Sequence, residues 1–202
     1  MTGMLALLGR ALALAFASGV NLYATVVVVG LAQWSGWVPL PPRFAIFGSP
    51  WIIGAAGLLF LAEFVADKIP WLDTVWDGIH TAVRPLGGAL LAAATVGAVH
   101  PALQGSVALA GALVAAASHL TKAGTRAMVN ASPSTPANWT ISLAEDLFVL
   151  GLATLALRRP LAALAVWAVL TLIILGSARL LARAVRRRFL RPDPGPAPGA
   201  QH

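Results

Sequence analysis

Six of the seven acidic residues fall in two short stretches of a chain that is otherwise apolar. The first stretch holds Glu63 and Asp67, four residues apart, followed by Asp73, Asp77 and His80 at spacings of four and three. Each set would share one face of a helix, because residues three or four apart on a helix lie on the same side. Carboxylates and an imidazole on one face can relay protons or ligate a divalent cation.

The second of these sets also has a simpler interpretation. Trp71 and Trp76 accompany Asp73 and Asp77, and tryptophan is enriched at the level of the lipid headgroups. A helix lying in the membrane interface would carry these acids in water. We favour this interpretation over a metal site formed by Asp73, Asp77 and His80, because no short ligand signature such as His-Glu-x-x-His occurs.

The second acidic stretch is the pair Glu145 and Asp146, in the middle of an apolar segment. A carboxylate at membrane depth is costly, so it should face the protein interior, a partner or water. Lys122 and Arg126, one helical turn apart, are the cations best placed to pair with these acids. Two hypotheses stay open: Glu145 and Lys122 only fasten helices together, or they take part in moving an ion or a proton.

Polar residues also interrupt two of the apolar segments. The first segment contains Gly19 and Asn21, and the fourth contains His119 close to Lys122. Small and amide-bearing residues at a break in a helix can expose backbone groups to a solute or an ion. Glycine equally permits close packing of unbroken helices, so the sequence leaves both interpretations open.

The composition shows which elements must position these residues. Apolar residues make up 58% of the 202 positions and charged residues 10%, which is far from the composition of a soluble domain. No charged residue lies between Arg10 and Arg43 or between Pro85 and Thr121, and about 20 helical residues cross a bilayer. The apolar runs lack a two-residue period, so helices are predicted rather than strands. The predicted spans are residues 5–34, 51–66, 86–99, 102–123, 139–157 and 161–181.

The two halves of the chain repeat short motifs in the same order. Leu61-Ala62-Glu63 matches Leu143-Ala144-Glu145, and Arg84-Pro85-Leu86 matches Arg159-Pro160-Leu161. Ser18 likewise matches Ser118. Three spans in each copy would force the copies to cross the membrane in opposite senses. The sequence therefore predicts an all-α membrane protein with six transmembrane helices as two inverted three-helix repeats, residues 1–99 and 100–182, in which Glu63 and Glu145 are counterparts.

Six of the fourteen basic residues are arginines between positions 179 and 191, next to the last apolar segment. Such a cluster is typical of a cytoplasmic anchor that is attracted to anionic lipid, so we predict that both termini are cytoplasmic. Nucleic-acid binding is disfavoured, since no folded soluble module accompanies the cluster. Residues 183–202 are predicted to be a basic and then disordered tail. The absence of cysteine excludes disulfides and thiolate ligands.

Three strings resemble a known family. They are Glu63-Phe-Val-Ala-Asp-Lys-Ile-Pro70, the stretch from Asp77 to Arg84-Pro85 with Gly87-Gly88-Ala89-Leu90, and Ser142-Leu-Ala-Glu145-Asp146. They are similar to the bacterial integral-membrane family catalogued as domain of unknown function 4126. The resemblance implies the architecture and a bacterial cytoplasmic (inner) membrane location, and it implies nothing about substrate. His80 departs from the residue usual in the family, which disfavours a family-wide metal role.

These features predict a small secondary carrier, coupled to protons or ions, rather than an enzyme. Glu63 and Glu145 would titrate or coordinate, with Lys122 as their charge partner. Supporting roles are expected for Asp67, Asp146, Asn21, His119, Arg126 and Arg84. The alternatives are a channel or dimeric pore, favoured by helices rich in Gly and Ala, and an intramembrane enzyme acting on lipid. The expected partners are the lipid bilayer, a small solute or ion and a second copy of the chain, with no cofactor except a divalent cation.

Overall fold

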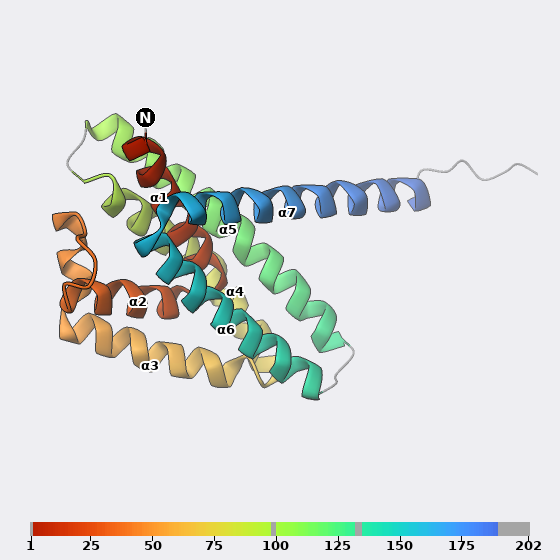
Figure 1. Ribbon diagram of the computed structural model, residues 1–202. Helices are drawn as coiled ribbons and strands as arrows, with labels where there is room; N and C mark the ends of the chain where they lie inside the picture. The colour runs from red at the N-terminus through yellow and green to blue at the C-terminus, as the bar shows by residue number, and fades with distance from the viewer. Residues whose placement is uncertain (1, 98–99, 132–134, 190–202) are drawn as a thin grey trace, which may run out of the picture. The chain divides into compact units, whose positions relative to one another are not determined.

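The computed structural model describes residues 2–97, 100–131 and 135–189, and every regular element in these ranges is helical. In chain order they are α1 (Thr2–Val20), α2 (Leu22–Trp34), the 3-10 helix η1 (Pro42–Gly48), α3 (Pro50–Ala66), α4 (Pro70–Thr95), α5 (Pro101–Ala131), α6 (Thr135–Arg158) and α7 (Pro160–Phe189) (Figure 1). The prediction of an all-helical chain is confirmed for these residues. The stretch predicted to be disordered, Pro192 to His202, lies outside them.

Four of these helices are long and apolar enough to cross a membrane. The qualifying stretches are Gly3–Val20, Pro101–Ala131, Pro136–Arg158 and Pro160–Arg183. A fifth span results if η1 and α3, which meet at an angle of 62°, count as one bent span. The chain therefore has the helices of a membrane protein, and the predicted number of six spans depends on α4.

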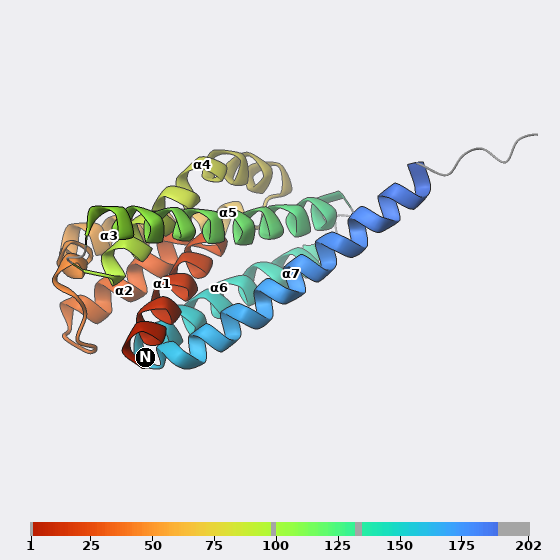
Figure 2. The same ribbon diagram turned by 90° about the horizontal axis from the view of Figure 1, so that it is seen from above.

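The chain divides into two compact units, residues 1–167 and 168–202, and α7 runs from the first into the second. Within the first unit, α1 packs against α4, α5 and α6, while α2 packs against η1, α3 and α6 (Figures 1 and 2). The buried face of α1 carries small side chains, among them Ala13, Ala17 and Ser18. Small residues let helix backbones approach closely, which suits α1 to a position between three neighbours.

The first predicted span, residues 5–34, is two helices instead of one. The break falls at Asn21, whose backbone is extended (φ −146°) and whose side-chain oxygen accepts a hydrogen bond from the backbone N–H of Ala24. Asparagine is among the preferred N-cap residues because its side chain satisfies one of the free N–H groups at the start of a helix. Asn21 thus ends α1 and begins α2.

The third predicted span was residues 86–99, and residues 86–95 form the second half of a longer helix, α4. The expected separate interfacial helix with its acids in water is wrong, because Asp73 is fully buried and His80 is only 2% exposed. The polar first half of α4 is buried, and its charged side chains form ion pairs with residues of α3 and α5. The helix continues without a break through Pro85 into its apolar second half. Its charged residues explain why α4 is not among the apolar spans.

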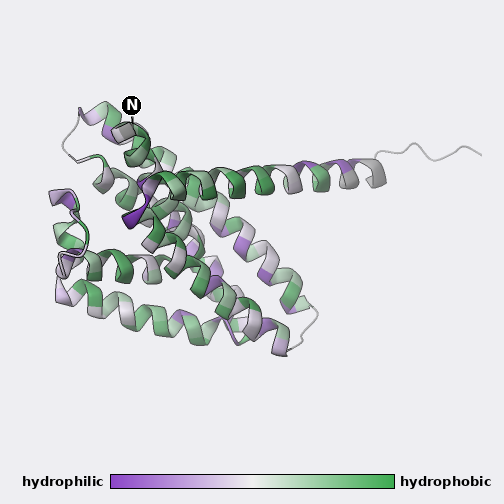
Figure 3. Cartoon of the chain, in the orientation of Figure 1, coloured by the Kyte–Doolittle hydropathy of each residue, from purple (hydrophilic) through white to green (hydrophobic). Residues whose placement is uncertain are grey.

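Burial follows the pattern expected in lipid rather than in water. Large apolar side chains such as Leu58, Leu109 and Leu147 are more than 60% exposed, whereas several charged side chains are buried. In Figure 3 the ribbons of the first unit are green over long stretches, where the residues are hydrophobic, and are interrupted by short purple stretches. Lipid is as apolar as leucine, so the exposed side chains cost nothing there, and the polar groups must be satisfied inside.

Helices α4 and α5 pack so closely that only glycine fits at two contact positions, Gly88 and Gly111. A Cβ atom on Gly88 would meet the side chain of Ala115 and lie 2.9 Å from the carbonyl oxygen of Gly111. A Cβ atom on Gly111 would lie 2.6 Å from the carbonyl oxygen of Gly88. The two backbones therefore touch, and this contact sets the spacing of the charged side chains farther along both helices.

Gly88→Val should lower the free energy of unfolding by roughly 1–3 kcal/mol, the usual cost of overpacking a tight contact. The matched control is Gly105→Val, because Gly105 lies on α5 and a Cβ atom added there would meet nothing within 4 Å. Both changes introduce valine into a helix, so the difference between them isolates the effect of packing. Reversible unfolding in mixed micelles, followed by circular dichroism, measures it. Equal stabilities of the two variants would contradict the close contact.

Candidate functional site

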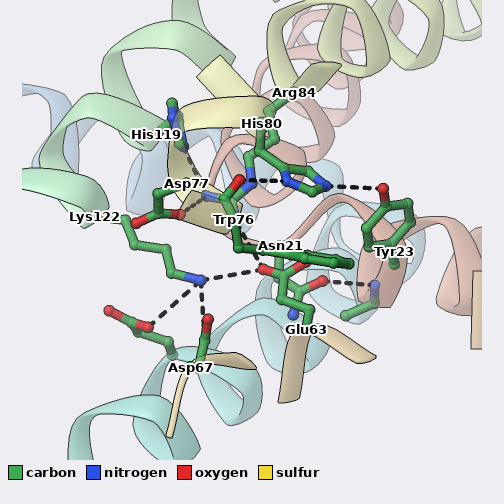
Figure 4. Close-up of polar contacts among 12 residues, drawn as sticks. Asn21, Tyr23, Glu63, Asp67, Trp76, Asp77, His80, Arg84, His119 and Lys122 are labelled. Atoms are coloured by element: carbon green, nitrogen blue, oxygen red, sulfur yellow. Dashed lines mark hydrogen bonds and ion pairs between the residues drawn. The ribbon is translucent and has the colours of Figure 1, made fainter. Parts of the chain in front are cut away.

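A network of buried charges lies in the first unit, where α3, α4, α5 and α6 come together near the break between α1 and α2 (Figure 4). It contains six acidic and three basic side chains. The acids are Glu63, Asp67, Asp73, Asp77, Glu145 and Asp146, and the bases are Arg84, Lys122 and Arg126. All nine were singled out from the sequence, and the structure brings them into one region.

Lys122 of α5 stands among three carboxylates. Its Nζ atom donates hydrogen bonds to Glu63 Oε1 at 3.1 Å and to Asp67 Oδ2 at 3.1 Å. It also lies 3.8 Å from Glu145 Oε2, which makes an ion pair beyond hydrogen-bond distance. Glu63 and Glu145, the two residues matched by the sequence repeat, thus face the same ammonium group from α3 and α6.

Arg84 of α4 extends the network towards α1 and α5. Its Nη2 donates to Glu63 Oε1 at 2.7 Å, and its Nη1 lies 3.3 Å from Asp77 Oδ1. The same Nη1 donates to His119 Nδ1 at 2.7 Å and to the carbonyl oxygen of Gly19 at 3.3 Å. A guanidinium only donates, so His119 Nδ1 must accept, and the proton of this neutral imidazole lies on Nε2, facing Thr81 Oγ1 at 3.0 Å.

Arg126, one turn after Lys122 on α5, connects three other elements. Its Nε donates to Asp73 Oδ2 on α4 at 3.1 Å, and its Nη1 donates to the carbonyl oxygen of Asn138 on α6 at 3.3 Å. Its Nη2 donates to the carbonyl oxygen of Asp67, the C-cap of α3. The side chain therefore fastens α5 to α3, α4 and α6 at once.

Asn21, the residue at the helix break, joins the network through Asp146. Its Nδ2 donates to Asp146 Oδ1 at 3.0 Å while its Oδ1 caps α2. The break also leaves the carbonyl oxygen of Gly19 free to accept from Arg84. The break therefore supplies both an amide and a backbone carbonyl to the charged region.

His80 lies apart from the carboxylates. Its Nδ1 donates to the carbonyl oxygen of Trp76 at 2.7 Å, its Nε2 faces Tyr23 Oη at 2.8 Å, and its ring stacks on Trp76 with centroids 4.8 Å apart (Figure 4). Within the described part of the chain, no group of three or more His, Asp or Glu side chains has the arrangement of a metal site. The structure therefore gives no support to Asp73, Asp77 and His80 as a joint ligand set.

Comparison with known proteins decides the family. The family described as "Domain of unknown function (DUF4126)" matches residues 8–180. The chain belongs to this family. No curated protein and no solved structure matches the DUF4126 chain. The matched range contains every residue of the charged network, so the network is part of the DUF4126 domain itself.

Some residues of the DUF4126 site were not anticipated. Tyr23 is the only tyrosine of the chain and contacts His80, and Asn130 donates to Asp73 Oδ2 at 2.7 Å. Ser142 and Asn138 are buried on α6. Ser142 and Asn138 precede Glu145–Asp146 at helical spacings of three to eight residues. That periodicity was the available signal that α6 has a polar face.

The carboxylates of the DUF4126 site outnumber its cations, six to three, and five of the six are buried, while the Glu145 side chain is 16% exposed. Each of the six also has a buried oxygen atom without a hydrogen-bond partner. These atoms are Glu63 Oε2, Asp67 Oδ1, Asp73 Oδ1, Asp77 Oδ1, Glu145 Oε2 and Asp146 Oδ2. Buried acceptors are normally satisfied, so a site with this many free acceptors is suited to bind protons or a cation.

Lys68 does not remove this imbalance. It lies in the turn after α3, where its Nζ donates to the carbonyl oxygen of Phe64 at 2.8 Å and to Ser142 Oγ at 3.4 Å. Burial lowers the pKa of this ammonium group, and the charges of Asp146 and Asp67 oppose the change. Even with half-buried Lys68 included, the DUF4126 site has more carboxylates than cations.

Proposed function

We propose that this protein is a small secondary membrane carrier coupled to protons or cations, with Glu63 and Glu145 as the coupling groups on either side of Lys122. The observation that carries the proposal is the excess of buried carboxylates around a single lysine, each with an unpartnered oxygen. A network with only a structural role would be expected to balance its charges, because an uncompensated buried charge is strongly destabilising. Binding of a proton or a cation would balance the excess negative charge of this network.

The proposal includes an inverted repeat of three helices in each half. It is supported by the shared contact of Glu63 and Glu145 with Lys122, and by Ser18 and Ser118, each of which donates to the carbonyl oxygen three residues earlier. Six spans require α4 to cross the membrane. Its 26 residues correspond to about 39 Å at 1.5 Å per residue, enough for the roughly 30 Å hydrocarbon core. The break at Asn21 distinguishes the first copy, since α5 is continuous at the matching position.

We also propose an orientation with the arginine-rich end of α7 in the cytoplasm. Arg179, Arg183 and Arg186 lie in the last turns of the helix, at and just beyond the end of its apolar stretch. Positive charges next to a span favour the cytoplasmic side. The N-terminus lies on the same side if the six spans are correct.

A flux experiment tests the carrier. The purified protein is reconstituted into vesicles that contain a pH-sensitive dye, and gradients of Na⁺, K⁺, Mg²⁺ or butylammonium are imposed in turn. We expect saturable proton movement with one of these gradients. Glu63→Gln and Glu145→Gln should each reduce it at least about tenfold, since each removes a titrating group that the coupled step requires.

The matched control is Asp193→Asn, because Asp193 is the one acidic residue beyond the family match. It should leave the flux unchanged. The carrier proposal fails if both glutamine variants fold normally and transport like the unmodified protein. Large currents that do not saturate would indicate a pore instead, and turnover of lipid without flux would indicate an enzyme.

A further inference from the structure

A cavity of about 190 Å³ lies between α4 and α5, beside the Asp73–Arg126 ion pair. Its wall includes Asp73, Asp77 and Asn130. Thr74, Gly78 and Thr81 complete the α4 side. For scale, an engineered cavity of roughly 150 Å³ in another protein binds benzene, so this cavity has room for a small organic molecule.

The cavity wall presents hydrogen-bond acceptors that have no partner. Asp73 Oδ1 and Asn130 Oδ1 are buried and have no hydrogen-bond partner, and Asp77 Oδ1 accepts no hydrogen bond and meets only Arg84 Nη1, as an ion pair at 3.3 Å. Asp73 is fully buried and Asp77 is 6% exposed, so bulk water does not compensate for the missing bonds. Buried acceptors are normally satisfied, so two unpartnered acceptors beside a carboxylate with a single ion pair indicate a ligand that donates hydrogen bonds.

The hydroxyl and amide donors on the same wall are already used. The hydroxyls of Thr74 and Thr81 donate to the carbonyl oxygens of Pro70 and Asp77, which leaves only their lone pairs for a ligand. Asn130 Nδ2 donates to Asp73 Oδ2 at 2.7 Å and to the carbonyl oxygen of Pro70.

Arg126, the cation in the wall, has three of its five N–H groups in hydrogen bonds. Its Nε, Nη1 and Nη2 are bonded to Asp73, to the carbonyl oxygen of Asn138 and to that of Asp67. The wall therefore offers unpartnered acceptors, and its charged residues are two carboxylates and one guanidinium, with Arg84 outside the wall pairing with Asp77.

We propose that this cavity binds a small organic cation with N–H donors, of the primary ammonium or guanidinium type. A directly ligated divalent metal fits less well, since the described residues contain no group of three His, Asp or Glu side chains placed to hold one. This inference depends on the proposed carrier function in one respect only, namely that the bound cation is also the transported solute. The binding itself is tested separately.

Calorimetry on the purified full chain in detergent tests the ligand class with three compounds of equal heavy-atom number. Butylammonium has the charge and the N–H donors, tetramethylammonium has the charge without donors, and 1-butanol has a donor without charge. We expect butylammonium to bind at least about tenfold more tightly than either of the others, because charge-assisted hydrogen bonds need both properties. Equal binding of 1-butanol or tetramethylammonium, or binding of Mg²⁺ alone, would overturn the proposal.

Gly78→Leu tests the location. Gly78 lines the cavity and an added Cβ would meet nothing within 4 Å, so leucine fills the space without displacing the carboxylates. Gly54→Leu is the control, because Gly54 on α3 is equally unobstructed and lies outside the cavity. We expect butylammonium binding to fall at least about tenfold in Gly78→Leu only. Unchanged binding in Gly78→Leu would overturn the assignment.

The two proposals fail in different ways. Butylammonium that binds at the cavity without moving across vesicles would overturn the carrier and leave the binding site standing. Ion-coupled flux that persists in Gly78→Leu, with no butylammonium binding in the unmodified chain, would support the carrier and overturn the cavity ligand.

Discussion

Replacing Lys122 with methionine should lower the free energy of unfolding by about 3–5 kcal/mol, the cost of leaving a buried charge without its partner. Methionine has a similar length and packs readily, so the change removes mainly the charge. The largest part of this cost should arise at Asp67, because Lys122 is the cation that its carboxylate contacts in the structure. Glu63 would still form its ion pair with Arg84. Unfolding in mixed micelles, followed by circular dichroism, measures the loss.

A second substitution separates lost charge pairing from lost packing. Adding Asp67→Asn to Lys122→Met should recover about half of the lost stability, since the uncompensated carboxylate is then gone. Lys68→Met serves as the control. Lys68 is half-buried and its ammonium contacts neutral oxygens, so its loss should cost about 1 kcal/mol or less. No recovery in the double variant would show that the carboxylates around Lys122 are held protonated or otherwise neutral.

The flux of a second double variant decides whether the ion pair of Glu145 and Lys122 has only a structural role or also a role in transport. If Glu145→Gln combined with Lys122→Met restores both stability and flux, the pair only fastens α5 to α6. We expect stability to recover while flux stays at least about tenfold reduced, because the proposed coupling needs a titrating group at position 145. Asp193→Asn again provides the unchanged reference.

The pairing of Lys122 with Glu145 was predictable from the sequence for an electrostatic reason, whereas the predicted pairing of Arg126 with the same acids is wrong, since Arg126 pairs with Asp73. Acids and bases at membrane depth are few, and each is too costly to leave alone, so Glu145 and Lys122 had few partners to choose from. The structure places them 3.8 Å apart. The central part of the site therefore follows from composition and spacing.

The course of the backbone near the site was harder to predict. The sequence suggested a break near Asn21 but could not decide it, because an asparagine N-cap and an asparagine facing a helix neighbour have the same local pattern. The continuity of α4 through Pro85 was missed. It depends on Arg84 reaching Glu63 and His119, contacts between residues 21 and 35 positions apart that no local periodicity reveals.

Arg126→Lys should lower the free energy of unfolding by roughly 2–3 kcal/mol even though it preserves the charge. The arginine donates from three nitrogen atoms to Asp73, Asn138 and Asp67, which lie on three elements. A lysine has one nitrogen at the end of its chain and cannot reach all three. The carbonyl oxygen of Asp67 is the critical acceptor, because carbonyls at the C-terminal end of a helix have no partner within that helix.

Arg158→Lys is the matched control for this change. Arg158 is exposed at the end of α6, with its guanidinium 4.2 Å from the centre of the Trp37 ring, a contact that lysine can replace. It should alter stability by less than about 1 kcal/mol. If Arg126→Lys is equally mild, a single ammonium suffices to hold α5 against α3, α4 and α6. The shape of the guanidinium would then be irrelevant to the site, and charge alone would position its carboxylates.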